Sequence, residues 1–457
     1  MSLEKSPSSA CSHSLLRYTP SSHADKVRYQ SRTEQQLATA AGHKGTEKSI
    51  SERMFPGPLL LPGDDLSSDP RYPPQSLRSW IALKERNEVT HRRNVIYICG
   101  PPAIEPSLQY IREWSLPQGQ YPSQEVSVTP PRPQDMADYL AAFYHGLRVK
   151  TFSPDALRFS EWIDGKGRKA KADPAHIGLD TADESIRIRV RPSPDGTFQG
   201  QLNLNDLLDT ALSILPDDAY ALMMLVEHDL FEDEDDDFCC GRAYGGSRVA
   251  VVSMARYNPV LDASQHVERQ HAWPASHCEA YVQNCCKEQS KKTGKTSRKA
   301  VTTDEATITP SSLTNASTSN MTPLQAAVDA YRGRTSPDVS GLWLSRVCQT
   351  ASHELGHCFG MDHCVYYACV MQSTSSLAED VRQPPYLCPV DHAKVARATG
   401  TNERARYEAL LSFCINHAHA PMFAAFAAWL RIILGQGDGR REQTSPASGS
   451  RHKPIEL

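Results

Sequence analysis

The sequence predicts an α/β fold of the α+β kind, with a mixed twisted sheet beside one long helix. Three observations support this. Residues 220–228 are an almost continuous apolar run, which is typical of a strand buried on both faces. Residues 238–244 and 248–257 flank a Gly-Gly pair and predict a β-hairpin. Residues 342–359 repeat apolar side chains at the three-and-four spacing of a helix with one buried face.

Shorter patterns predict the remaining elements. We expect strands at 94–99 and 148–152, and helices at 135–147, 202–215, 389–399 and 403–415. Residues 422–435 are apolar, but the run is too short for a membrane span and contains Arg431. They therefore predict a buried or docking helix.

Composition predicts one folded domain with long disordered parts. The 457 residues include 32 prolines and 25 glycines, and the mean hydropathy is -0.49. We expect a disordered N-terminal segment at 1–75 and a folded domain at 76–435. A low-complexity insertion at about 260–335 would interrupt that domain, and a disordered tail would follow at 436–457.

Charge and apolar patterning bear on partners and compartment. A net charge of -4 indicates neither nucleic acid nor an anionic membrane as a partner. The first residues lack the apolar core of a signal peptide, so we expect an intracellular, cytoplasmic protein, with the nucleus also open. We expect it to act as a monomer. In a reducing compartment the 13 cysteines suggest metal binding or catalysis rather than disulfides.

The most informative segment is HELGHCFGMDHC at 353–364. His353 and His357 are four apart, so on a helix both rings face one metal ion. Gly360 can adopt the left-handed conformation that ends a helix, and His363 can then return to the metal. Three imidazoles leave a fourth position for water, whose proton Glu354 could take as it attacks a carbonyl. An ordinary helix with exposed histidines would not explain the later Gly and His.

A second pattern follows directly. Cys364 is the neighbour of His363 and would face the other way in an extended segment. With Cys369 and Cys388 it suits a closed structural zinc site, although unrelated buried thiols are the alternative. Met371 is placed where a methionine turn beneath the catalytic metal would lie. His277, Cys278, Cys285 and Cys286 match no defined metal-site spacing, so we interpret the three cysteines as free thiols.

At these residues the sequence resembles the archaemetzincins, whose pattern is H-E-x-x-H-x-x-G-x-x-H-C-x4-C-x-M followed by C-x-x-C. The resemblance covers about 40 residues. It implies a metzincin-like fold and an intracellular zinc metalloprotease that acts on peptides or proteins. It also implies one catalytic Zn²⁺, one structural Zn²⁺, and Glu354 as general base toward a metal-bound water. The family's last cysteine would fall at Asp391, so Asp391 or the adjacent His392 is the expected fourth ligand of the structural zinc.

Other functions remain open at this stage. The chain could be a zinc-binding interaction protein without turnover, since disordered segments often bind partners. It could also be a thermolysin-type enzyme with a glutamate from a later helix as third ligand, although His363 argues against that. If it is a protease, residues 248–257 are the expected edge strand for substrate. Aminopeptidase and endopeptidase activity are both compatible with the motif.

Overall fold

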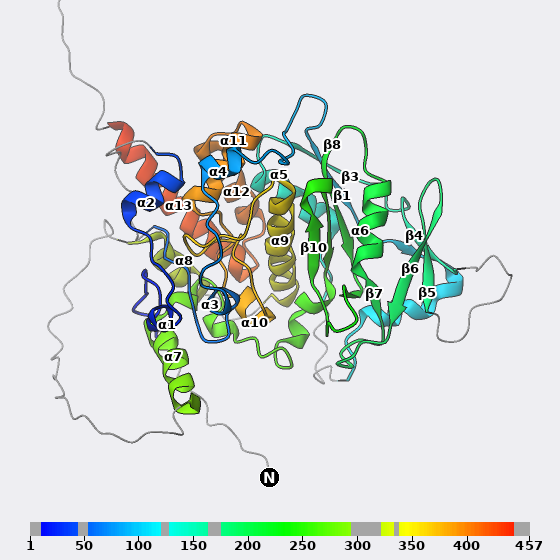
Figure 1. Cartoon of the computed structure of the whole chain (residues 1–457), viewed down its shortest axis with the longest axis horizontal. Coiled ribbons are helices and arrows are strands. Elements are labelled where there is room, and N and C mark those ends of the chain that lie inside the picture. Colours follow the sequence, from blue (N-terminus) through cyan, green and yellow to red (C-terminus); the bar gives the residue numbers. More distant parts are fainter. Residues whose placement is uncertain are drawn as a thin grey trace, which may run out of the picture.

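The protein is described here by a computed structural model. It describes residues 11–43, 54–119, 128–162, 175–293, 321–332 and 338–442. Two sheets lie on one side of the molecule and most helices on the other, with the long helix α9 (Val339–Cys358) between them (Figure 1). The predicted mixed α/β fold is confirmed.

The first sheet has the strand order β10-β11-β8-β1-β3. Its strands are β1 (Val95–Cys99), β3 (Arg148–Thr151), β8 (Ala219–Val226), β10 (Gly241–Tyr244) and β11 (Val249–Ser253). β8 is buried along its whole length and has a parallel neighbour on each side, as its apolar run predicted. β10 and β11 form the predicted antiparallel hairpin.

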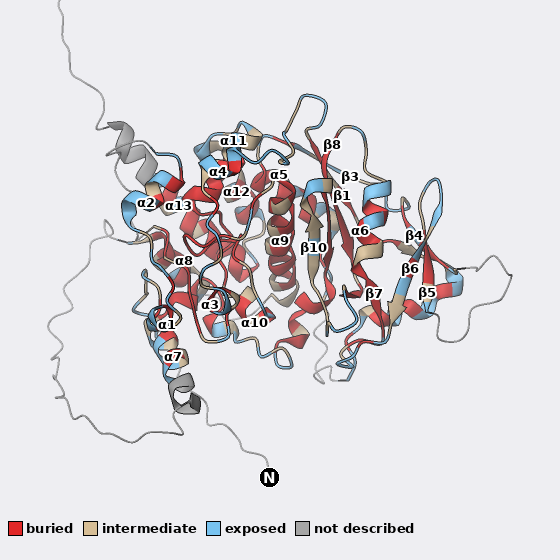
Figure 2. Ribbon diagram, in the orientation of Figure 1, coloured by how far each residue is buried: buried red, intermediate tan, exposed pale blue. Residues whose placement is uncertain are grey.

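Helices cover both faces of this sheet. Met223 and Leu225 point into a core shared with α9 and α5 (Pro133–Phe143). Leu222 and Met224 alternate to the other face, where α6 (Leu204–Ser213) packs. Figure 2 shows that α9 is buried along most of its length, so its side chains have little freedom to move.

The second sheet has the order β2-β4-β5-β6-β7-β9, and the sequence did not predict it. Its strands are β2 (Ala103–Ile104), β4 (Arg158–Ser160), β5 (His176–Asp180), β6 (Ser185–Arg191), β7 (Gln201–Asn203) and β9 (Asp229–Phe231). Four of these six strands are only two or three residues long, which is too short for a clear alternation of apolar and polar residues. A 3-10 helix at Pro106–Ser115 packs beside them.

The C-terminal helices α11 (Pro389–Thr399), α12 (Glu403–Asn416) and α13 (Pro421–Glu442) lie at the predicted positions. The short helix α10 (Leu377–Asp380) was not predicted. α13 packs on α8 (Pro323–Arg332) and α12, so the apolar run at 422–435 is a buried helix. In the part of the chain that the structure describes, no helix has the length and apolar character needed to cross a membrane.

The N-terminal segment differs from the prediction of disorder over 1–75. Within its described residues lie α1 (Ser22–Lys26), α2 (Glu34–Ala40) and α3 (Asp65–Ser68), with α4 (Leu77–Ile81) just beyond. Leu37 and Phe55 are part of the main core. These few apolar residues contact partners hundreds of positions away, so the local sequence does not reveal them.

The N-terminal segment also contacts the loop that follows α9. The Tyr29 hydroxyl donates to the Val365 carbonyl at 2.7 Å, and the Ala368 amide donates to the Pro56 carbonyl at 3.0 Å. The Gln75 side chain donates to the Gly360 carbonyl at 3.0 Å. Residues that precede the predicted domain start therefore pack beneath the loop that carries His363.

The predicted insertion at 260–335 is only partly described. Residues 260–293 contain short 3-10 helices and α7 (Glu279–Thr293), with Trp273 and Val282 buried. Residues 294–320 and 333–337 lie outside the described part, as does the predicted tail beyond Glu442.

Candidate metal centres

Three histidines at the end of α9 form the first candidate centre. His353 and His357 lie one turn apart, and α9 ends at Cys358. Gly360 has φ of 73°, the left-handed conformation expected of it, and the chain then returns with His363. The ligand atoms of the three histidines lie within 4.8 Å of one another, so the structure brings the three motif histidines together.

Backbone carbonyls fix two of these rings. His353 Nδ1 lies 2.7 Å from the Val370 carbonyl, and His357 Nδ1 lies 2.8 Å from the Met361 carbonyl. Each Nδ1–H therefore donates to a carbonyl, and the two Nε2 lone pairs face each other 3.1 Å apart. Such lone pairs repel unless a cation lies between them. In a tetrahedral zinc site with Zn–N bonds of about 2.1 Å, two nitrogens would be roughly 3.4 Å apart.

The rings are also kept in the neutral form that binds metals. Burial, with the neighbouring His357, lowers the pKa of His363 to about 4. Burial and the two other rings lower the pKa of His353 well below its usual value. The donor set, the ring orientation and the protonation state therefore all fit a divalent zinc ion.

Glu354 lies beside the three histidines and is 9% exposed. Burial, followed by the charge of Asp380, raises the pKa of Glu354 to about 8, while Arg242 acts in the opposite direction. An adjacent cation would favour the carboxylate form. The group is thus placed to exchange a proton near neutral pH.

The second candidate centre contains Cys364, Cys369, Cys388 and Asp391, all buried, with ligand atoms within 4.8 Å of one another. The Sγ atoms of Cys364 and Cys388 are 3.6 Å apart. Asp391 Oδ2 lies 3.3 Å from Cys369 Sγ, and its Oδ1 accepts from Lys394 Nζ at 2.7 Å. Burial, followed by Cys364, raises the pKa of Asp391 to about 7. Buried thiolates and a carboxylate repel one another, so this set fits a site whose charge a cation neutralises.

His392 takes no part in this group. Its ring stacks on Tyr407 with centroids 5.5 Å apart and an interplanar angle of 24°. Of the two expected fourth ligands, Asp391 is the one that faces the thiols.

Met371 lies directly beneath the first centre. It is fully buried and packs against Gly356, on the helical turn between His353 and His357. Its carbonyl accepts a hydrogen bond from the Cys364 amide at 2.7 Å. One residue thus contacts both the active-site helix and the loop that holds the cysteines.

Two cavities flank the first centre, each of about 560 Å³. His353, Glu354 and His363 line both cavities, and so does Gly241 of β10. The edge strand beside the centre is therefore β10. The prediction that 248–257 forms this edge is wrong, because β11 lies between β10 and β8. The sequence carried a signal for this: the first four residues of β11 (VAVVS) are apolar, whereas β10 (GRAY) contains an arginine.

The sequence reasoning also missed Asp380 and Tyr257, which line the first cavity with Glu354. Asp380 accepts a hydrogen bond from Tyr257, and burial raises the pKa of Asp380 to about 6. Asp380 lies in a helix of four residues, and no local pattern could have singled it out.

The structure does not bring His277, Cys278, Cys285 and Cys286 together as one group. Cys285 and Cys286 lie on α7 and pack near Leu59 and Leu61. His277 is buried with Nε2 3.4 Å from the Gly57 carbonyl. Cys278 instead joins Cys11, His13 and His271 in a third cluster.

Comparisons with known proteins place the two predicted centres in one matched segment. Residues 324–397 match Peptidase family M54. Archaemetzincin-2 of Mus musculus is 23% identical over 312 residues, which are 65% of this chain and 66% of that protein. The archaemetzincin of Methanopyrus kandleri is 42% identical over 66 residues, 14% of this chain and 37% of that protein.

The chain therefore spans less than two thirds of the length of these relatives. The crystal structure of the Methanopyrus kandleri archaemetzincin matches at 16% identity with a TM-score of 0.30, covering 68% of this chain and 98% of that chain. A TM-score this low does not establish a shared fold. The resemblance predicted from the motif is nevertheless confirmed in sequence: the chain is similar to archaemetzincins, and its residues 324–397 match Peptidase family M54.

Proposed function

We propose that this protein is a zinc-dependent metallopeptidase of the metzincin type, which cleaves peptide bonds in peptide or protein substrates. The observation that carries the proposal is the convergence of His353, His357 and His363, with Nε2 lone pairs facing one another beside a buried Glu354. The archaemetzincin relatives supply a second, independent line of support.

His353, His357 and His363 would hold the catalytic zinc. Zinc bound there supplies Lewis-acid chemistry, which acidifies water and polarises a peptide carbonyl. Glu354 takes the proton from the attacking water and delivers it to the leaving amine. Burial raises the pKa of Glu354 and an adjacent zinc ion would lower it, and these opposing effects suit a group that takes up a proton and then releases it.

Cys364, Cys369, Cys388 and Asp391 would hold a second, structural zinc. All four side chains are buried, at 5% exposure or less. Such a closed site fixes a loop rather than reacts. It would hold the segment after His363 against the start of α11, and so position the third catalytic ligand.

Substrate would lie along β10, between the two cavities. An extended peptide can add a strand to an exposed sheet edge, and β10 is the edge next to Glu354. Cavities on both sides of the centre can take residues on either side of a scissile bond, which favours endopeptidase cleavage. Action as an intracellular monomer stays a prediction from the sequence.

The test compares the wild type with Glu354→Gln, which keeps the size of the side chain but cannot take a proton. Zinc per chain is measured together with cleavage of a peptide library. We expect both proteins to hold the same zinc and only the wild type to cleave, with a loss of at least a hundredfold in the variant.

If both proteins hold zinc and neither cleaves, the zinc-binding interaction protein becomes the better account. A thermolysin-type site is less well supported, because the carboxylate of Glu379, the glutamate of α10, accepts hydrogen bonds from the Asp65 and Ser375 amides. The variant His363→Ala separates a metzincin-type site from a thermolysin-type site. The metzincin-type site should lose its catalytic zinc, whereas a thermolysin-type site would keep it.

A further inference from the structure

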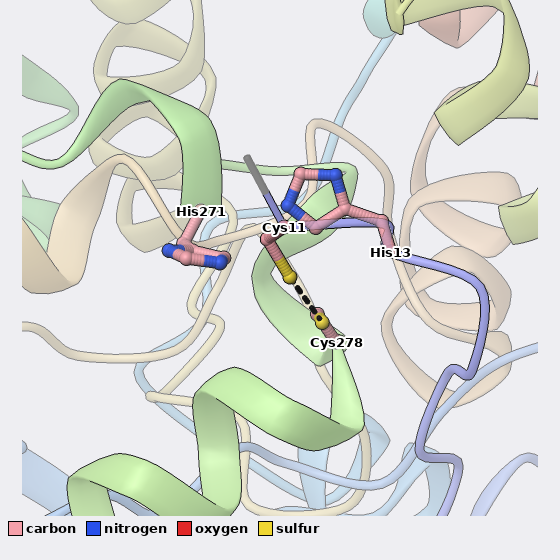
Figure 3. Close-up of side chains that lie close together, drawn as sticks. All are labelled: Cys11, His13, His271 and Cys278. Atoms are coloured by element: carbon pink, nitrogen blue, oxygen red, sulfur yellow. Dashed lines mark hydrogen bonds between the residues drawn. The ribbon is translucent and has the colours of Figure 1, made fainter. Parts of the chain in front are cut away.

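A third metal-ligand cluster lies outside the matched family segment. Cys11 and His13 come from the N-terminal segment, and His271 and Cys278 come from the region before α7 (Figure 3). Their ligand atoms lie within 4.8 Å of one another. The Sγ atoms of Cys11 and Cys278 are 3.4 Å apart, although these residues are 267 positions apart in the chain.

The two histidines are buried without hydrogen-bond partners. His13 is 7% exposed and His271 is 6% exposed. Among the described residues, no ring nitrogen of either histidine makes a hydrogen bond. Glu268 Oε1 lies 2.9 Å from His271 Nδ1, close enough for an ion pair but not aligned as a hydrogen bond. Buried polar nitrogens normally have a partner, so these rings point to a ligand.

We propose that Cys11, His13, His271 and Cys278 bind a structural zinc ion. Two thiolates and two imidazoles are a common structural zinc set, and with Zn²⁺ they make a neutral centre that tolerates burial. In a tetrahedral site with Zn–S bonds of about 2.3 Å, two sulfurs would be roughly 3.8 Å apart. The 3.4 Å between Cys11 and Cys278 is near that value and far from the roughly 2.0 Å of a disulfide bond.

This zinc fastens the N-terminal segment to the middle of the chain. Residues 15–17 already run beside 277–279: the Arg17 amide donates to the His277 carbonyl at 2.7 Å, and the Glu279 amide donates to the Leu15 carbonyl at 2.9 Å. The Trp273 amide donates to the Val381 carbonyl at 2.9 Å, next to Asp380 in the wall of the first cavity. The ion therefore stabilises a connection that reaches from the N-terminal segment to the active-site wall.

The experiment counts zinc in the full-length protein by mass spectrometry under native conditions. We expect Cys11→Ser and His13→Ala each to hold one zinc fewer than the wild type, and His13→Cys to restore it because a thiolate replaces the imidazole. Cys285→Ser is the matched control, since Cys285 is also a half-buried cysteine in this region but lies outside the cluster. Equal zinc in the wild type and Cys11→Ser would overturn the proposal.

A second measurement on the wild type does not depend on a folded variant. Cys11 and Cys278 should resist alkylation until a chelator is added, and peptide mapping identifies the protected thiols. Recovery of Cys11 and Cys278 as a disulfide, or alkylation of Cys11 that a chelator does not change, would overturn the assignment. The zinc count compares the wild type with variants of this cluster. Its outcome therefore does not depend on whether the protein cleaves peptides.

Discussion

Met371 packs against the Cα of Gly356 so closely that a methyl group on Gly356 would overlap the methionine sulfur. Gly356 lies between the two helical histidines, and Met371 lies on the loop between two of the clustered cysteines. The contact therefore sets the separation between the active-site helix and the loop that follows His363.

The first prediction is that Gly356→Ala destabilises the protein. The added methyl must displace Met371, and overpacking of this kind lowers the free energy of unfolding by about 1–3 kcal/mol. We also expect weaker retention of the catalytic zinc during dialysis against a chelator. Gly435→Ala is the control, because its new methyl would meet open space and should be neutral or stabilising by about 0.5–1 kcal/mol. Equal unfolding midpoints for the two variants would contradict the prediction.

A second prediction separates Asp391 from His392. Asp391→Ala should lose the zinc of the cysteine cluster, and should also leave the Lys394 ammonium without its carboxylate, which costs about 3–5 kcal/mol when a buried pair is broken. His392→Ala removes only a ring stacked on Tyr407 and should keep the zinc. Asp391→Cys should keep it as well. Zinc content and urea unfolding measure both effects, and zinc loss in His392→Ala alone would reverse the assignment.

A third prediction concerns Arg242 on the edge strand. Arg242→Glu reverses a charge that borders the second cavity, so peptides with acidic residues near the scissile bond should be cleaved less well. Selectivity should change roughly fivefold, since one exposed charge contact is worth about 1 kcal/mol or less. Lys150→Glu is the control, because Lys150 is equally an exposed cation in an ion pair but lies on β3, the opposite edge. A cleavage profile that shifts in neither variant would count against β10 as the substrate strand.

A fourth prediction concerns pH and Glu379, which lies outside the three proposed zinc sites. Burial, followed by the charge of Asp64, raises the pKa of Glu379 to about 7, above its usual value of 4.5. The folded protein therefore binds this proton more tightly than the unfolded chain does. The resulting stability is fully present below about pH 4.5 and is lost as the pH rises to about 7, by at most about 3 kcal/mol.

Glu379→Gln should flatten this dependence, because an amide does not titrate. The free energy of unfolding of the wild type and the variant is compared at pH 5.5 and pH 8. The wild type should lose more stability between the two values than the variant does. Parallel curves would show that Glu379 does not titrate in this range.

The sequence predicted those parts of the molecule that depend on local pattern. The helix that carries His353 and His357 has a strong apolar period, and the turn at Gly360 needs a left-handed residue, so both were predictable. β8 was predictable because a strand whose two faces are both buried is apolar throughout. Asp391 was one of two expected fourth ligands, with His392, because it occupies the position of a missing cysteine.

The remainder depends on contacts that no local window contains. Strands such as β7 and β9 have three residues each, which is too few for an alternating pattern to appear. The N-terminal helices are polar overall and bury a few side chains against distant partners such as Val365. The sequence could not predict that Cys11 lies beside Cys278, because the two residues are 267 positions apart and only the fold brings them together.

The packing of Tyr29, Pro56 and Gln75 against the loop after α9 bears on how shortened versions of this protein behave. A fragment that starts at Ser76 would lose two hydrogen bonds: the one that the Tyr29 hydroxyl donates to the Val365 carbonyl, and the one that the Ala368 amide donates to the Pro56 carbonyl. It would also expose the apolar surface that the N-terminal segment covers. Such a fragment keeps the residues of the catalytic centre and of the Cys364 cluster but loses Cys11 and His13, and it exposes the support of its own metal loop to water. The residues that support this loop therefore reach back at least to Tyr29, well outside the matched segment at 324–397.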